Sequence, residues 1–164
     1  MAVAVLRTKD IEGDIVATPH HKGIKLVAHF TKLPAGKHGF HIHKAGDLRG
    51  EGCHGLCEHF DKGHHKHGDA PTGSKKERHT GDLGNIAIPD GRKEVRKTYY
   101  LPDVSIQELW GRSIIVHEGE DDLGRGSWED SHTTGHSGAR MGCAIFGRMA
   151  CPLSKHRTRK APKK

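Results

Sequence analysis

The chain has 164 residues, of which 33% are apolar and 5% aromatic, a length suited to one domain with a lean core. Its 22 glycines exceed the usual share and favour short strands joined by many shaped loops. The apolar runs are too short for a transmembrane helix, and residues 1–10, MAVAVLRTKD, lack the basic-then-apolar order of a secretory signal. We therefore expect a protein that does not enter a membrane and that stays in the cytoplasm.

The net charge of +7 is concentrated at one end of the chain. Residues 152–164, PLSKHRTRKAPKK, contain six Lys or Arg and no acid, so the rest of the chain carries only +1. Basic proteins can bind nucleic acid, but here the charge lies in a tail. We predict a domain over residues 1–151 and a basic, disordered tail over 152–164. Weak contact of this tail with nucleic acid or an acidic surface is the alternative to a solvated end.

Short stretches with strand character run through most of the chain. The first is 2–7 and the second is 24–30, where apolar side chains occupy every other position. The third is 37–43, in which Phe40 and Ile42 are expected on opposite faces. Further strands are expected at 83–88, 94–100, 112–117 and 141–149, with irregular segments at 44–82 and 118–140. Short strands, glycine turns and almost no helical period predict an all-β sandwich or barrel.

Histidine is unusually frequent, at 16 of 164 residues. His41 and His43 are two apart in an expected strand, so their imidazoles project to the same side. His117 ends the apolar run at 113–116 and adds a third imidazole held by a strand. A lone H-x-H pair is weak evidence for a metal. Imidazoles on neighbouring strands, however, suit copper, which favours nitrogen donors.

The irregular segment 44–82 supplies a second group of candidate ligands. These are three imidazoles and one carboxylate, a donor set that fits a closed tetrahedral zinc site: His59, His67, His79 and Asp82. The spacing of His79 and Asp82 lets both side chains converge from one turn. Spacing alone does not choose among His64, His65 and His67, and a solvated polar run is the simpler interpretation of this HHKH stretch.

Six segments resemble, in the same order, the signature stretches of the copper/zinc superoxide dismutases. They are GFHIH at 39–43, GC at 52–53, HF at 59–60, ERHTGDLGN at 77–85, IIVHEGEDDLGRG at 114–126 and TGHSGARMGC at 134–143. The similarity covers about residues 2 to 150, and six motifs in register make it specific. The basic tail lies outside it.

This resemblance implies an eight-stranded antiparallel Greek-key β-barrel, an immunoglobulin-like sandwich with two long functional loops. It implies an oxidoreductase that converts two superoxide anions to dioxygen and hydrogen peroxide by alternating reduction and oxidation of copper. The implied cofactors are one copper ion and one zinc ion per subunit, and the implied assembly is a homodimer.

The resemblance also implies the metal ligands. For copper they would be His41, His43, His59 and His117. For zinc they would be His59, His67, His79 and Asp82, with His59 shared as a bridging imidazolate. The HGDAP stretch at 67–71 is similar to the family's His-Gly-x-Pro pattern and favours His67 over His64 and His65.

Three further residues match positions around the family's copper site. Asp121 would link a copper histidine to a zinc histidine and fix the orientation of both rings. Arg140 would attract and orient superoxide, and Thr134 would narrow the channel opposite it. His59 would also carry a proton for the departing peroxide. These roles define the catalytic residues that the resemblance implies.

Three rival functions fit the residues less well. A copper chaperone would be expected to lack some of the seven ligands, and all are present. A copper-only dismutase would lack the zinc ligands. A metal-buffering or nucleic-acid-binding protein would need neither this order of histidines nor Arg140.

The chain has four cysteines, and they are expected in two different states. In a chain without an export signal they would ordinarily suggest free thiols or a metal site. The resemblance instead implies a disulfide between Cys53 and Cys143. Cys57 and Cys151 have no counterpart and are expected to be free, although Cys57 could compete with Cys53 for Cys143.

The sequence departs from the family pattern at two places. At the usual dimer contact, three residues are unusual: Ala45, Trp110 and Arg148. Other contact positions fit, so a homodimer with altered packing is expected. In the loop before Arg140, Glu129 and Asp130 keep the family's two acids, but Thr133 stands where a lysine is expected.

Overall fold

The computed structural model describes residues 1–63, 65–71 and 77–150. The expected tail at 152–164, Cys151 and the alternative ligand His64 lie outside the described residues. No helix in the described part of the chain is long and apolar enough to span a membrane.

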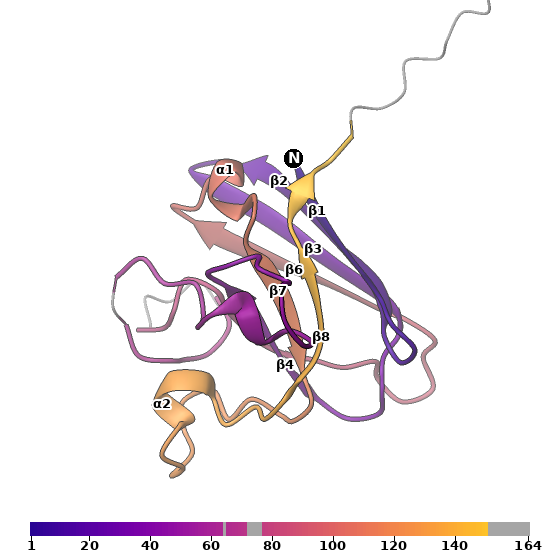
Figure 1. The fold of residues 1–164 in the computed structure, drawn as a ribbon, viewed down its shortest axis with the longest axis vertical. Coiled ribbons are helices and arrows are strands. Elements are labelled where there is room, and N and C mark those ends of the chain that lie inside the picture. Colours follow the sequence, from indigo (N-terminus) through magenta and orange to yellow (C-terminus); the bar gives the residue numbers. More distant parts are fainter. Residues whose placement is uncertain (64, 72–76, 151–164) are drawn as a thin grey trace, which may run out of the picture.

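The described residues form two antiparallel sheets that pack face to face (Figure 1). One sheet has five strands in the order β6-β3-β2-β1-β9, and the other has four in the order β5-β4-β7-β8. The first sheet comprises β1 (Ala2–Arg7), β2 (Glu12–His20), β3 (Gly23–Lys32), β6 (Val95–Pro102) and β9 (Gly147–Arg148). The second comprises β4 (His38–His43), β5 (Asp82–Ile86), β7 (Ser113–His117) and β8 (Arg140–Ile145).

The strand order is that of a Greek key, which confirms the expected all-β fold. The chain leaves the five-stranded sheet after β3 and returns after β5, and β6 then pairs with β3. The described residues have nine strands rather than eight because the last one is divided at Phe146: β8 pairs with β7, and β9 pairs with β1. The last strand thus joins the two sheets along one side. Along the other side, the edge strands β5 and β6 share no ladder among the residues described.

The core lies between the sheets and follows strand alternation. Along β3, the inward side chains Ile24, Leu26, Ala28 and Phe30 are each at most 1% exposed. The expectation that Phe40 and Ile42 point to opposite faces is wrong. Residues two apart in a strand share a face, and both side chains lie fully buried in this core.

Strand β2 was not expected, and its sequence, EGDIVATPH, contains glycine and proline, which are unfavourable in strands. In the structure β2 lies between β1 and β3, which supply ladder partners on both sides. Pro19 lies beyond Ala17, the last residue of β2 that pairs with β1, so its missing N–H removes no ladder bond on that side. Tertiary pairing therefore outweighs weak local propensity here.

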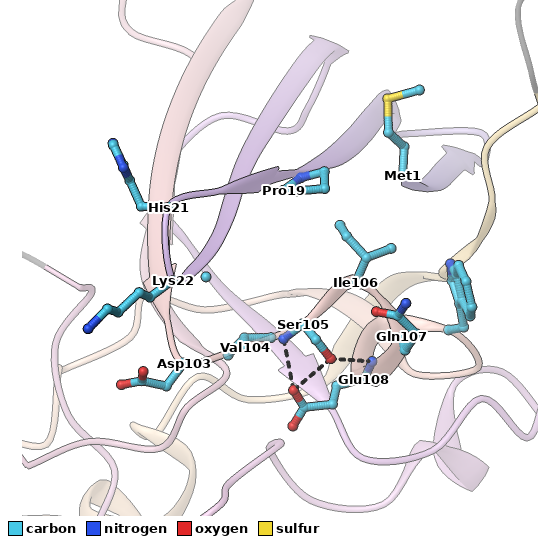
Figure 2. Close-up of a pocket in the computed structure, with 12 residues that line it drawn as sticks. Met1, Pro19, His21, Lys22, Asp103, Val104, Ser105, Ile106, Gln107 and Glu108 are labelled. Carbon is cyan, nitrogen blue, oxygen red and sulfur yellow. Dashed lines mark hydrogen bonds between the residues drawn. The ribbon is translucent and has the colours of Figure 1, made fainter.

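Two four-residue helices were also unexpected: α1 (Ile106–Leu109) and α2 (Ser131–Thr134). A reciprocal capping box begins α1, in which the Ser105 N–H donates to Glu108 Oε2 at 2.8 Å and the Glu108 N–H donates to Ser105 Oγ at 3.4 Å (Figure 2). The S-x-x-E spacing is a sequence signal that could have located this helix.

A disulfide joins Cys53, in the segment 44–82, to Cys143 on β8, across a sequence separation of 90. Cys57 is a free, exposed thiol. The bond attaches the long loop to the last strand, and the pairing agrees with the one that the resemblance implied.

We predict that Cys143→Ala lowers the free energy of unfolding by about 4 to 5 kcal/mol, because the bond closes a long loop in the unfolded chain. Cys57→Ala should leave it nearly unchanged. Denaturant unfolding measures both values. Under non-reducing peptide mapping, Cys57 and Cys151 should be alkylated, and a dominant Cys57–Cys143 peptide would contradict the pairing.

Candidate metal centre

The metal-site histidines lie on the outer face of the four-stranded sheet. Because β4 alternates, Phe40 and Ile42 enter the core while His41 and His43 project to the other side. Strand β7 pairs with β4 and ends at His117, beside them. A bridge between His43 and His59 brings the loop residue His59 over the same face.

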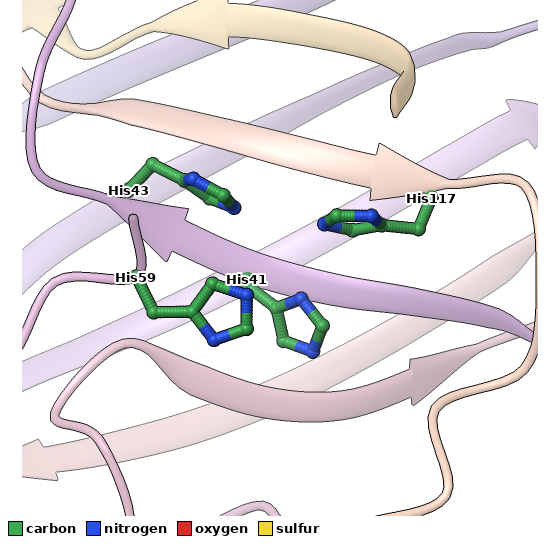
Figure 3. Close-up of side chains that lie close together, drawn as sticks. All are labelled: His41, His43, His59 and His117. Carbon is green, nitrogen blue, oxygen red and sulfur yellow. The ribbon is translucent and has the colours of Figure 1, made fainter. Parts of the chain in front are cut away.

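Four imidazoles converge here, as Figure 3 shows. One nitrogen from each of His41, His43, His59 and His117 lies within 4.8 Å of the others, and the four side chains are buried. Within this cluster, the nitrogens for which the described part of the chain offers no hydrogen-bond partner are His41 Nδ1, His43 Nε2, His59 Nε2 and His117 Nε2. These are the four residues expected to bind copper.

The second nitrogen of each ring is held by a neighbour. His43 Nδ1 lies 2.9 Å from the Cys57 carbonyl, and His117 Nδ1 lies 3.2 Å from the Gly138 carbonyl. His41 Nε2 lies 2.8 Å from Asp121 Oδ2. If each held nitrogen carries the proton, the opposite nitrogen presents a lone pair to the cluster.

Burial keeps these rings neutral at pH 7. It lowers the pKa of His41 to about 3 and that of His117 to about 4. The pKa of His43 also falls well below its usual value, first through burial and then through repulsion from His59. Neutral imidazoles with unpartnered nitrogens are good donors for a soft or borderline metal ion, so this cluster fits copper.

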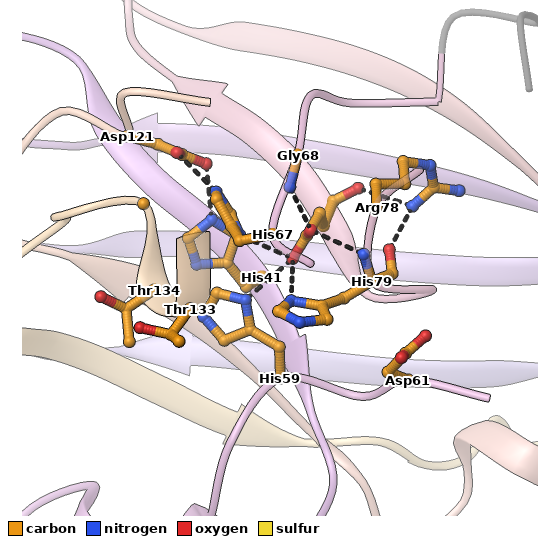
Figure 4. Close-up of polar contacts among 12 residues, drawn as sticks. His41, His59, Asp61, His67, Gly68, Arg78, His79, Asp121, Thr133 and Thr134 are labelled. Carbon is orange, nitrogen blue, oxygen red and sulfur yellow. Dashed lines mark hydrogen bonds and ion pairs between the residues drawn. The ribbon is translucent and has the colours of Figure 1, made fainter. Parts of the chain in front are cut away.

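A second cluster surrounds Asp82, the first residue of β5 (Figure 4). Its Oδ1 lies 2.8 Å from His59 Nδ1, 3.1 Å from His67 Nδ1 and 3.3 Å from His79 Nδ1. One carboxylate oxygen cannot accept well from three rings at once. A cation at the centre of these four donors accounts for the convergence, and three nitrogens with one oxygen suit zinc.

His79 lies slightly outside the tightest group of donors. That group, within 4.8 Å, contains His41 together with His59, His67 and Asp82. His41 Nε2 already faces Asp121, whereas His79 Nδ1 faces Asp82. The contacts therefore pair His79 with Asp82 as the sequence spacing suggested. His65 lies elsewhere, with its Nδ1 3.0 Å from Asp61.

The negative charge buried in the second cluster also favours a bound cation. The side chains of Asp82 and Asp121 are fully buried, and their carboxyl pKa values are well below the usual range. Between them lies His67, with Nδ1 toward Asp82 and Nε2 2.8 Å from Asp121 Oδ1. Burial lowers the pKa of His67, but its interactions with the two carboxylates outweigh this effect and raise the pKa to about 9. The two buried carboxylates, Asp82 and Asp121, thus share the single positive charge of protonated His67. A bound metal ion would add the positive charge that is missing.

Arg140 lies at the start of β8 and reaches across to the loop that carries the disulfide. Its Nη1 donates to the Cys53 carbonyl at 2.8 Å, and its Nη2 donates to the Cys57 carbonyl at 2.6 Å. The Cys57 carbonyl therefore contacts both Arg140 and the ring of His43. Sequence reasoning did not assign this backbone role to Cys57, whose positive φ of 60° only the fold reveals.

Thr134 is the last residue of α2, and its Oγ1 donates to Asp130 Oδ2 at 3.0 Å. Gly135 follows with φ 68°, and a Cβ there would lie 2.1 Å from Asp121 Oδ1 and 2.4 Å from His67 Nε2. Only glycine fits this close approach, so Gly135 brings α2 against the metal site. Sequence reasoning missed it, although the Thr-Gly pair after a helical turn is a usual ending signal.

A groove of about 560 Å³ lies elsewhere, between α1 and the β2–β3 turn (Figure 2). Its lining includes Met1, His21 and Ile106 but none of the candidate metal ligands. We assign the chemistry to the histidine clusters and none to this groove.

Together, the Greek-key sandwich and the two adjoining donor clusters define a dinuclear metalloprotein of the copper/zinc type. Comparison with known proteins identifies the family. The family model for copper/zinc superoxide dismutase matches residues 11–146. The chain belongs to the copper/zinc superoxide dismutase family. It is an oxidoreductase that dismutes superoxide, with copper and zinc as cofactors.

Three similar proteins illustrate the range of the family. Superoxide dismutase [Cu-Zn] 2 of Mesembryanthemum crystallinum is 40% identical over 153 residues, covering 91% of this chain and 96% of that protein. The extracellular superoxide dismutase [Cu-Zn] of Caenorhabditis elegans is 44% identical over 126 residues, covering 76% of this chain and 55%, about half, of that protein. The crystal structure of the clock protein EA4 superposes with a TM-score of 0.79 at 36% identity, covering 89% of this chain and 92% of that one.

Proposed function

We propose that the two donor clusters hold one copper ion and one zinc ion and that His59 bridges them. The copper ligands are His41, His43, His59 and His117. The zinc ligands are His59, His67, His79 and Asp82. The observation that carries this proposal is the position of His59, whose Nε2 faces the copper cluster while its Nδ1 faces Asp82.

Copper, when bound, supplies the one-electron redox couple that dismutation needs, whereas zinc supplies charge and structure. The protein supplies the positioning and the protons. Asp121 orients His41 and His67 through one carboxylate oxygen each. Among the described residues His59 Nε2 has no hydrogen-bond partner, so, whenever it is free of the metal, this nitrogen would hold a proton that peroxide can accept.

Arg140 and Thr134 are the residues that we assign to the substrate anion. The two carbonyls that hold the Arg140 guanidinium fix a permanent positive charge, which attracts superoxide. Asp130, the residue just before the short helix α2, orients Thr134. The two side chains belong to β8 and α2, the elements on either side of Gly135 to Ala139, and we place the substrate path between them.

Replacing His59 by Ala should reduce the binding of both metals, because one ring serves both clusters. His67→Ala should reduce zinc first. The matched control is His65→Ala, whose side chain is exposed and bonded to Asp61. His64→Ala should likewise affect neither metal. Elemental analysis after dialysis against a weak chelator measures the content; equal zinc loss from the His64 and His67 variants would reverse the ligand choice.

Charge steering should be weaker than the family pattern implies. Thr133 replaces a positive charge, and its Oγ1 donates to the Asp130 carbonyl at 3.0 Å. Arg125 does not compensate, because it pairs with Asp69 at 2.7 Å. Arg140 therefore supplies most of the local attraction for an anion.

We predict that Thr133→Lys raises kcat/KM about twofold at low salt, since a unit charge ~10 Å away in water contributes ~0.4 kcal/mol. The gain should shrink as salt screens the field. Arg140→Glu should lower kcat/KM at least about tenfold without loss of copper, because it reverses the nearest charge. Pulse radiolysis across an ionic-strength series measures both. Rates that neither substitution changes would show that steering is not limiting.

We also propose a homodimer formed by residues 1–151, with residues 152–164 as an accessory tail. Apolar side chains are exposed along the edge formed by β1 and β9: Met1 (48%), Val5 (47%) and Met149 (38%). The Arg148 guanidinium lies 4.1 Å from the Trp110 ring centre, which makes this edge less apolar. An interface here would bury the exposed apolar area.

A chain that ends at residue 151 should remain dimeric by sedimentation equilibrium and should keep its metals and activity. Only the full-length chain should show weak, salt-sensitive binding to DNA, because the tail carries the basic residues. Loss of copper from the shortened chain would contradict the domain boundary. A monomer at micromolar concentration would contradict the dimer.

A cytoplasmic location is our remaining proposal. The exposed free thiol of Cys57 suits a reducing compartment. The disulfide is the opposing observation, and a similar protein from Caenorhabditis elegans is extracellular. Fractionation of the source cells tests the proposal, and recovery of the protein from the medium would overturn it.

A further inference from the structure

Lys97 occupies an unusual place for a lysine. It lies on β6 and is half-buried on the inward face of the strand, next to Tyr99, which is 3% exposed. Its Nζ lies 5.2 Å from the centre of the Tyr99 ring. Burial lowers the pKa of this ammonium group, and Asp69 opposes that shift only in part. Placing a lysine here costs free energy, which some interaction must offset.

The interaction that Lys97 makes spans the open side of the sandwich. Its Nζ donates to the Asn85 carbonyl at 2.9 Å. Lys97 belongs to β6, an edge strand of the five-stranded sheet, and Asn85 belongs to β5, an edge strand of the four-stranded sheet. Because no described ladder joins β5 to β6, this charge-assisted bond is a direct polar link between the two edges.

Asn85 connects this link to the metal centre. Its Nδ2 donates to the Asp121 carbonyl at 2.8 Å, and its Oδ1 accepts from the Asp121 N–H at 2.8 Å. This two-point contact fixes the backbone of Asp121. The two carboxylate oxygens of Asp121 then lie 2.8 Å from His41 Nε2 and from His67 Nε2 (Figure 4).

We propose that Lys97 is a positioning residue for the dinuclear site. It holds the β5 edge at Asn85, and Asn85 in turn holds Asp121 against one histidine of each metal cluster. The inference rests on the proposed function, which assigns His41 to copper and His67 to zinc. Groups that orient metal ligands commonly change metal affinity about 10- to 100-fold when they are removed.

The test replaces Lys97 by Met, which keeps an unbranched side chain one atom shorter and removes the charge and the donors. The matched control is Arg96→Met, which removes a positive charge from the adjacent, exposed position of β6. Lys97→Arg, which restores a charged donor, should recover the wild-type behaviour. Each purified protein is loaded with copper and with either zinc or Co²⁺.

We expect zinc to dissociate into excess chelator at least about tenfold faster from Lys97→Met than from wild type or Arg96→Met. Because the ligand geometry is loosened, the visible absorption of Co²⁺ in the zinc site and the copper hyperfine splitting in electron paramagnetic resonance should also shift. A loss of thermal stability alone would not produce these spectral changes. If Lys97→Met does not fold, Lys97→Leu against Arg96→Leu makes the same comparison, because leucine also lacks a charge and a donor.

Equal zinc release and unchanged spectra in the Lys97 and Arg96 variants would overturn the inference, whatever their thermal stability. Failure of the wild-type chain to bind one copper and one zinc would instead overturn the proposed function. The wild-type stoichiometry therefore separates the two failures.

Discussion

The convergence of three imidazole nitrogens on Asp82 Oδ1, at 2.8 to 3.3 Å, is the contact around which the loops are arranged. All three rings, from His59, His67 and His79, come from the segment 44–82, and Asp82, the first residue of β5, supplies the carboxylate. In a buried place, such a set of donors is stable only with positive charge among them. A divalent cation meets this need, so metal binding and the folding of the loop are coupled.

Asp121 extends the same constraint to the second loop. Its carboxylate bridges His41, on β4, and His67, in the first loop. Gly135 then packs against this bridge because no Cβ intervenes. The His67 N–H also donates to the His132 carbonyl at 2.9 Å. The two loops are therefore held to each other beside the two donor clusters. A displacement of His67 or Asp121 is expected to shift the backbone of both loops.

The position of Arg140 depends on an unusual backbone conformation at Cys57. Cys57 has φ 60° and ψ −154°, a region that residues with a side chain seldom occupy and that costs ~1–3 kcal/mol. Its carbonyl contacts both His43 and Arg140. These two contacts couple a ring of the four-histidine cluster to the Arg140 guanidinium, which gives a physical reason for tolerating the strain.

The fold class and the grouping of several candidate ligands follow from the sequence alone, because they depend on residues that are close together in the chain. Alternation placed His41 and His43 on one side of a strand, and the spacing of His79 and Asp82 placed both in one turn. Short strands and many glycines indicated an all-β fold. Six motifs in order indicated the family, and the family model confirms it; the ligands that the resemblance implies remain a prediction.

Other features depended on partners distant in the chain. Strand β2 forms between two neighbours despite its glycine and proline, and the last strand divides because it pairs with both sheets. Spacing left His64, His65 and His67 equivalent, since only the folded loop brings His67 between two buried carboxylates. The link from Lys97 through Asn85 to Asp121 joins edge strands of opposite sheets, so no local pattern could indicate it. The sequence determined the kinds of donor atoms, and the tertiary structure decided which of them meet, because their convergence depends on contacts such as His59 with Asp82 across 23 residues and His41 with Asp121 across 80.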